Sequence, residues 1–140
     1  MSATLAPHRR HIPNVVAQLV RFGLVGATNT ALTLATYAAL VALHAPVALA
    51  AAAGWGVGAI NGYLLNGSWT FRGATRGAVS AARYGVVQLM GSGLNALLVA
   101  IAVGHEHLPH IAGELAVLPP VTLLTFVLCR SWVFPRAVPA

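Results

Sequence analysis

The chain has 140 residues, of which 58% are hydrophobic and only 7% are charged, and its formal net charge is +6. Soluble domains typically carry about 25% charged residues, whereas no Asp, Glu, Lys or Arg occurs from Phe22 to Phe71. Because a soluble fold of this size has no core large enough to hide such a stretch, the composition excludes a small soluble domain. It predicts an all-α integral membrane protein.

Four segments are long and apolar enough to cross a bilayer, which requires about 20 residues per helix. A turn at residues 44–46 divides the charge-free stretch into two spans, and Arg72 ends the second. The fourth segment contains two consecutive prolines and is predicted to be a bent helix, which a bundle tolerates. The expected organisation is a polar N-terminal tail (1–17), a four-helix membrane domain (18–136) with spans at about 22–43, 47–69, 84–103 and 112–134, and a short C-terminal tail (137–140).

All eight arginines fall on one side of the membrane if the chain crosses it four times. They precede the first span, connect the second to the third, or lie at the end of the fourth, and the opposite loops contain no Lys or Arg. Since cytoplasmic flanks collect basic residues, both termini are predicted to be cytoplasmic. The positive charge is spread along this face, so anionic membrane lipids are the expected counter-charge and nucleic acid is not an expected partner.

The two halves of the membrane region repeat a pattern. Arg21-Phe22-Gly23 opens the first pair of spans and Arg83-Tyr84-Gly85 opens the second. Each pair closes on Ser-Trp-x-Phe, and the separation from arginine to tryptophan is 48 residues in the first half and 49 in the second. A unit of two helices returns the chain to its starting side, so the halves are predicted to share one orientation, related by an axis along the membrane normal.

These motifs also resemble a known family. The opening Arg21-Phe22-x-x-Val25-Gly26 and the closing segment 63–71 are similar to those of the GtrA-like family of small bacterial polytopic membrane proteins. The resemblance covers nearly the whole chain after about residue 18. It implies a multi-pass protein of the bacterial plasma (inner) membrane that translocates a polyprenyl-phosphate-linked sugar for cell-surface polysaccharide or cell-wall glycan synthesis.

The chain departs from the family pattern in its closing motifs. The family usually has an arginine after the asparagine, whereas Gly67 follows Asn66 here. The second half has the arginine, Arg130, but Cys129 takes the place of the asparagine. Each half therefore retains one member of the usual pair.

Candidate substrate-binding residues are of two kinds. Guanidinium groups at the predicted cytoplasmic boundary suit a phosphate, and tryptophans at the same depth suit a sugar face. Neutral polar side chains recur on one face of the first and third helices, where they could line a path for sugar hydroxyls or hydrogen-bond between helices as packing contacts. The candidates are Arg21, Arg83, Arg130, Trp69, Trp132, Asn66, Asn29, Gln88 and Asn95.

A face of small residues runs along the second helix. Ala50, Gly54, Gly58 and Gly62 follow one another at steps of four, which permits close approach of another helix, either within the bundle or across a dimer. The sequence does not decide between the two. Four helices leave little room for an enclosed pathway. We therefore keep a homodimer as a hypothesis for the assembly of the protein.

An enzyme is not expected, and neither is a cofactor. Glycosyl transfer and hydrolysis generally use carboxylates, and the chain has only Glu106 and Glu114, both on the predicted outer side. No metal site is expected either, because the histidine-rich segment 105–110 matches no closed structural zinc spacing.

Two other functions remain as alternatives. A non-transporting adaptor that recruits or positions a glycosyltransferase suits the interfacial arginines and tryptophans equally well. A small proton-coupled efflux transporter is less favoured, because such proteins depend on a membrane-embedded carboxylate, and only Glu114 lies near the membrane.

Overall fold

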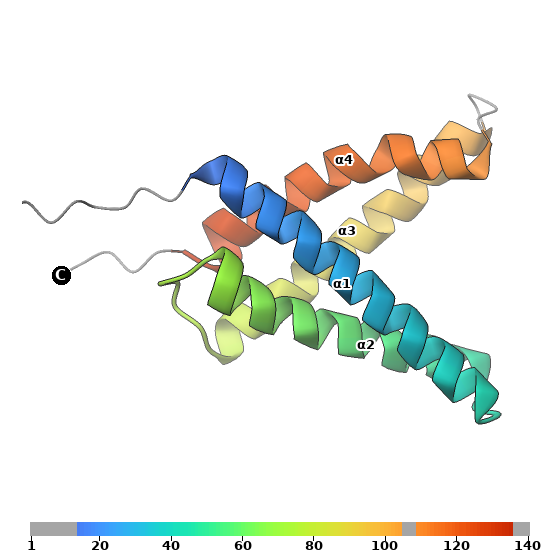
Figure 1. Cartoon of the computed structure of the whole chain (residues 1–140). Helices are drawn as coiled ribbons and strands as arrows, with labels where there is room; N and C mark the ends of the chain where they lie inside the picture. The colour runs from blue at the N-terminus through green and yellow to red at the C-terminus, as the bar shows by residue number, and fades with distance from the viewer. Residues whose placement is uncertain (1–13, 105–108, 136–140) are drawn as a thin grey trace, which may run out of the picture.

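The structure is a computed structural model that describes residues 14–104 and 109–135 (Figure 1). It is 87% helical and has four helices long and apolar enough to span a membrane. The predicted fold class, an all-α membrane protein of four spans, is confirmed. Its elements are α1 (Val15–Ala42), α2 (Val47–Leu65), the π-helical turn η1 (Asn66–Thr70), α3 (Ala78–Gly104), α4 (His110–Leu128) and the π-helical turn η2 (Cys129–Val133).

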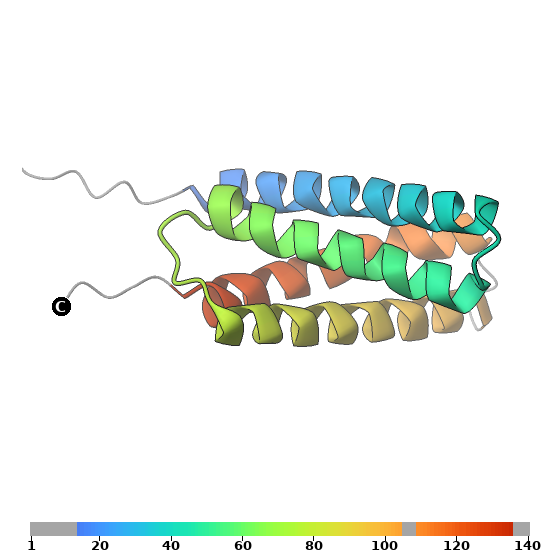
Figure 2. The ribbon, with the colours of Figure 1, turned by 90° about the horizontal axis from the view of Figure 1, so that it is seen from below.

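Each half of the chain forms an antiparallel helical hairpin, α1 with α2 and α3 with α4. The starts of α1 and α3 and the ends of η1 and η2 gather at one end of the molecule, which we call the terminal end (Figures 1 and 2). The hairpins meet there and diverge toward the opposite end (Figure 1). The two halves therefore run in the same direction, and the cytoplasmic position of the terminal end stays a prediction.

The first and third helices begin before the apolar stretches that predicted them. α1 starts at Val15 instead of residue 22, and α3 at Ala78 instead of residue 84. The side chain of Asn14 accepts a hydrogen bond from the Val16 N–H at 3.0 Å and so caps α1, and residues 15–22 contain no glycine or proline. A helix begins at its cap, so α1 includes the last residues of the predicted polar tail.

The first connection lies where it was predicted, and the segment with two prolines forms one helix; its predicted bend stays a prediction. His44, between α1 and α2, has a left-handed backbone with φ of 62°, and the Ala45 N–H bonds to the Leu40 carbonyl at 3.0 Å. Such an arrangement is a common way to end a helix. α4 continues through Pro119 and Pro120 as one helix.

The small face of α2 packs inside the bundle. Gly54, Gly58 and Gly62 are buried, and a methyl group added to Gly54 would lie 2.7 Å from the carbonyl oxygen of Thr33 on α1. A methyl group on Gly58 would meet the Thr33 hydroxyl, and one on Gly62 would meet the Asn29 amide. These glycines therefore set the close approach of α1 and α2, and α1 already occupies the face they form.

Aromatic side chains join the two hairpins at the terminal end. The ring centroids of Phe71 and Phe134 lie 5.3 Å apart, and those of Phe22 and Phe126 lie 5.6 Å apart. Because lipid removes most of the hydrophobic driving force between helices, such packing contacts hold a bundle together, and aromatic pairs contribute about 0.5–1.5 kcal/mol each. We call this cluster the aromatic core; its buried members are Phe22, Phe71, Tyr84, Val87, Phe126, Cys129, Val133 and Phe134.

Candidate functional site

The repeated motifs pair with each other within each half. Nη1 of Arg21 donates a hydrogen bond to the carbonyl of Trp69 at 3.4 Å, and its guanidinium lies 5.7 Å from the Trp69 ring centroid. Arg83 makes the same two contacts with Trp132, at 3.1 Å and 5.4 Å. The last carbonyls of a helix lack helical partners and carry partial negative charge. Each arginine therefore contacts the end of the neighbouring helix through both its guanidinium hydrogen bond and the tryptophan ring.

The π-helical turns give the tryptophan and phenylalanine of each closing motif different surroundings. The Phe71 N–H bonds to the Asn66 carbonyl and the Phe134 N–H to the Cys129 carbonyl, both at 2.8 Å, which closes the wider turn. The two phenylalanines lie in the aromatic core, whereas Trp132 is 42% exposed. The sequence repeat indicated that the two segments are equivalent, but no residue pattern signalled their π geometry.

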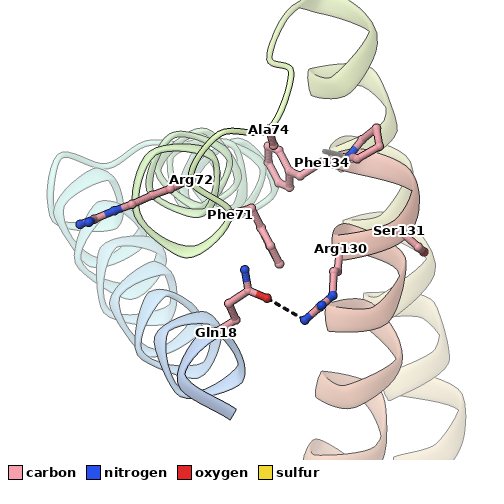
Figure 3. A pocket seen from close by; sticks show the side chains of 8 residues that line it. Gln18, Phe71, Arg72, Ala74, Arg130, Ser131 and Phe134 are labelled. Carbon is pink, nitrogen blue, oxygen red and sulfur yellow. Dashed lines mark hydrogen bonds between the residues drawn. The ribbon is translucent and has the colours of Figure 1, made fainter. Parts of the chain in front are cut away.

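Arg130 lies in a different environment from the other two candidate arginines. Its Nη1 donates to Oε1 of Gln18 at 2.7 Å, and Nε2 of Gln18 donates to the Thr70 carbonyl at 3.3 Å (Figure 3). These bonds connect α1 to the ends of both closing motifs. Gln18 is not among the residues predicted from the sequence, although it precedes Arg21 by three residues and therefore lies on the same face of α1.

A cavity of about 280 Å³ surrounds this pair at the terminal end, and we call it the terminal cavity. Two cationic side chains and no acidic side chain line this cavity. The guanidinium of Arg72 points away from the bonded Gln18 and Arg130 (Figure 3), so Arg130 is the cation directed at the polar centre of the cavity. The lining residues are Gln18, Phe71, Arg72, Ala74, Arg130, Ser131, Phe134 and Pro135. This arrangement suits a small anionic group.

The first half has no equivalent of this cavity arginine. Gly67 stands two residues before its tryptophan, as Arg130 does in the second half. A methyl group on Gly67 would lie 2.7 Å from Cδ of Arg76 and 3.2 Å from the Phe134 ring. Because the side chain of Arg76 already occupies this space, a longer side chain at position 67 would have to displace it.

A second hollow region lies between the hairpins, and we call it the interhairpin cleft. It consists of two cavities of about 710 and 450 Å³. No Lys, Arg, Asp, Glu or His lines either of them. The residues that both cavities share are Gly26, Asn29, Thr30, Gln88, Leu118, Thr122 and Thr125. The structure thus brings the neutral candidates together: Asn29 and Gln88 line both cavities, Asn66 the larger and Asn95 the smaller.

Hydrogen bonds between helices account for only some of these polar groups. Asn29 accepts a bond from Asn61 at 2.8 Å, and Asn95 donates to Glu114 at 3.0 Å. The Asn66 amide donates to the Tyr84 hydroxyl at 3.4 Å, but no described group bonds its Oδ1. Gln88 forms no side-chain hydrogen bond within the described ranges. The Oδ1 of Asn95 is likewise unbonded by any described group. Packing between helices therefore explains Asn29 better than it explains Asn66, Asn95 and Gln88.

The aromatic core separates the two hollow regions. Phe71 and Phe134 line the terminal cavity, and Phe22 lines the cleft. The centroids of Phe22 and Phe71 are 6.2 Å apart. A ligand that passed from one region to the other would have to part these rings.

The histidine-rich segment of the sequence falls largely on residues 105–108, which lie outside the described residues. Within the described ranges, no group of three or more His, Cys, Asp or Glu side chains could hold a metal ion.

Comparison with known proteins adds a family relationship. The family model described as the GtrA/DPMS transmembrane domain matches residues 21–134, which include all four helices except the first residues of α1. No curated protein matches the sequence.

Proposed function

Because the chain belongs to the GtrA/DPMS transmembrane-domain family, we propose that it translocates a polyprenyl-phosphate-linked sugar across the bacterial plasma membrane for cell-surface polysaccharide or cell-wall glycan synthesis. The observation that carries the proposal is the terminal cavity, in which Arg130 faces a space without acidic residues. Beside it, across the aromatic core, lies a cleft of neutral polar side chains. The two regions match the two parts of the headgroup, a charged phosphate and a hydroxyl-bearing sugar.

A phosphate would compete with Gln18 for Arg130. A guanidinium binds phosphate oxygens through two parallel, charge-assisted hydrogen bonds, which are stronger than a bond to a neutral amide oxygen. Gln18 Oε1 is such a neutral acceptor. Phosphate binding is therefore expected to replace the Gln18 bond, which joins the first hairpin to the second.

Translocation requires a second conformation, because a headgroup must be reached from each side of the membrane in turn. In the described state the aromatic core closes the terminal end, and the hairpins diverge away from it (Figure 1). Loss of the Gln18–Arg130 bond would remove one of the contacts that hold the terminal end closed. We propose that headgroup binding in this way favours the state that is open at the terminal end.

Reconstitution tests the proposal directly. Purified protein in liposomes should move a fluorescently labelled, short-chain polyprenyl-phosphate sugar from one leaflet to the other. Arg130→Gln should slow this movement at least about tenfold, because a hydrogen bond to a charged group contributes about 1.5–3 kcal/mol. The rate of Arg130→Lys should lie between those of wild type and Arg130→Gln, since lysine keeps the charge but lacks the bidentate geometry.

A matched control lines the same cavity. The Ser131 hydroxyl donates to the Val127 carbonyl of its own helix at 2.7 Å, so Ser131→Ala should leave the rate within about twofold of wild type. Arg21→Ala and Arg83→Ala should lose rate only to the extent that they lose folded protein. Wild-type rates from Arg130→Gln would refute the phosphate site.

The same preparation separates the proposal from its alternatives. We propose that the protein is not an enzyme, so the labelled lipid should be recovered chemically unchanged after transport. If the lipid does not cross the bilayer, and the protein instead co-purifies with a glycosyltransferase, the adaptor function is correct.

A further inference from the structure

The walls of the interhairpin cleft are largely apolar but carry several neutral polar groups, and no charged side chain lines them. Amide groups of Asn29, Asn66 and Gln88 line its larger cavity together with the hydroxyls of Tyr84 and Thr125. From these observations we infer that the cleft binds an uncharged, hydroxyl-bearing sugar and rejects sugars that carry a carboxylate. The inference rests on the proposed function and narrows its substrate class.

The charge selectivity follows from what an ion would meet in the cleft. Moving an ion out of water is far more costly than moving a hydroxyl, unless an opposite charge compensates for it. No cationic side chain lines either cavity, and the charged group beside them is the carboxylate of Glu114, which accepts a hydrogen bond from Asn95 of the smaller cavity. A uronic acid would therefore remain ionised without a counter-ion, or would have to be protonated to enter.

The preference for hydroxyls follows from the unsatisfied amides. An amide side chain both donates and accepts hydrogen bonds, as a sugar hydroxyl does. Gln88 lines both cavities and has no hydrogen-bond partner among the described side chains, and Asn66 is only 2% exposed with its Oδ1 unbonded by any described group. Unsatisfied polar groups are costly at membrane depth. A hydrocarbon chain in the cleft would leave Gln88 unsatisfied, whereas a sugar would supply its partners.

The α1 wall of the cleft leaves room for such a ligand. A methyl group added to Gly23 or Gly26 would meet no other atom within 4 Å, so open space borders both glycines. The larger cavity, about 710 Å³, lies within the range of about 300–1,000 Å³ typical of small-molecule sites. The phosphate of the same lipid has its own candidate partner in Arg130. Because the phosphate is bonded directly to the sugar, the rings of Phe22 and Phe71 must part for one headgroup to reach both regions.

Equilibrium binding to the full chain in lipid nanodiscs tests the inference without requiring transport. Three short-chain probes are compared: polyprenyl phosphate, polyprenyl-phosphate glucose and polyprenyl-phosphate glucuronic acid. Wild type should bind the glucose probe at least tenfold more tightly than polyprenyl phosphate. The glucuronic acid probe should bind no more tightly than polyprenyl phosphate.

A substitution that fills the cleft provides the second arm. Gly26→Leu should reduce the affinity for the glucose probe to that for polyprenyl phosphate. Gly93→Leu is the matched control, because Gly93 is also helical, also has nothing within 4 Å of an added methyl group, and lines neither cavity. It should retain the full preference for the glucose probe.

Three results would overturn the inference. The first is that wild type binds the glucose probe and polyprenyl phosphate with equal affinity. The second is that it binds the glucuronic acid probe as tightly as the glucose probe. The third is that Gly26→Leu loses affinity equally for all three probes, which would indicate that a lipid chain occupies the cleft. Failure of the proposed function looks different: selective binding would persist while the reconstituted protein moved no lipid.

Discussion

Gly54 on α2 lies against the backbone of α1, and its replacement by alanine tests whether this contact sets the distance between the two helices. The added methyl group would lie 2.7 Å from the carbonyl oxygen of Thr33, whereas ordinary contacts begin near 3.4 Å. The obstacle is a backbone atom, so no side-chain rotation relieves it. The helices must separate locally by roughly 0.7 Å.

The expected magnitude is the balance of two terms. An extra methyl group in a well-packed interior typically costs about 1–3 kcal/mol, whereas alanine in place of a helical glycine contributes about 0.8–1 kcal/mol of stability. Gly56 lies on the same helix, and an added methyl group there would meet nothing within 4 Å. Because the helix-propensity term is common to both sites, Gly54→Ala should be less stable than Gly56→Ala by about 1–3 kcal/mol.

The assay is reversible unfolding of wild type and the two variants in mixed micelles, followed by circular dichroism as the denaturing detergent is increased. Gly56→Ala should unfold at the same or a higher detergent fraction than wild type. Gly54→Ala should unfold at a lower fraction than Gly56→Ala. Coincident transitions of the two variants would show that the contact with Thr33 does not limit the approach of the helices.

Three further changes test the terminal end. Arg83→Ala should lower the free energy of unfolding by about 1–3 kcal/mol, because it removes both a charge-assisted hydrogen bond and a cation–π contact with Trp132; an effect no larger than that of Arg72→Ala would contradict this. Phe126→Ala should cost about 3–5 kcal/mol in the same measurement, whereas Val127→Ala, at a side chain that is 49% exposed, should change little. Tyr63→Phe removes the hydroxyl that lies 2.7 Å from Ser80 Oγ and 3.1 Å from the Gly77 carbonyl. Trypsin should then cleave the connection between α2 and α3 about two- to tenfold faster, because a hydrogen bond contributes about 0.5–1.5 kcal/mol. An unchanged cleavage rate would show that this bond does not restrain the connection.

Sequence patterns predicted the membrane fold because the relevant quantities are local. A span is recognised from the length of an apolar stretch, and the turn at residues 44–46 and the arginine at position 72 were visible without any knowledge of packing. The repeat of opening and closing motifs also indicated two hairpins with one orientation. The helix starts were less accurate, because hydropathy locates the apolar stretch, whereas a cap such as Asn14 determines where the helix begins.

The candidate site was predicted only as a set of residue types. Arg21, Arg83 and Arg130 looked alike in the sequence, since all three are arginines at one predicted boundary. The structure distinguishes them: tryptophan carbonyls and rings engage the first two, whereas Gln18 and an open cavity face the third. Whether an arginine is available to a ligand depends on partners 48 to 112 residues away in the chain.

Composition and periodicity by themselves determined that this chain crosses the membrane four times as two similar hairpins, because burial in lipid depends on the apolar content of each segment. Only the tertiary structure decided that the glycine face of α2 lies against α1, that Arg130 lines the terminal cavity whereas tryptophans engage Arg21 and Arg83, and that neutral amides from α1 and α3 share one cleft. The physical reason is that these features depend on how the helices rotate and diverge, which side-chain packing between hairpins determines.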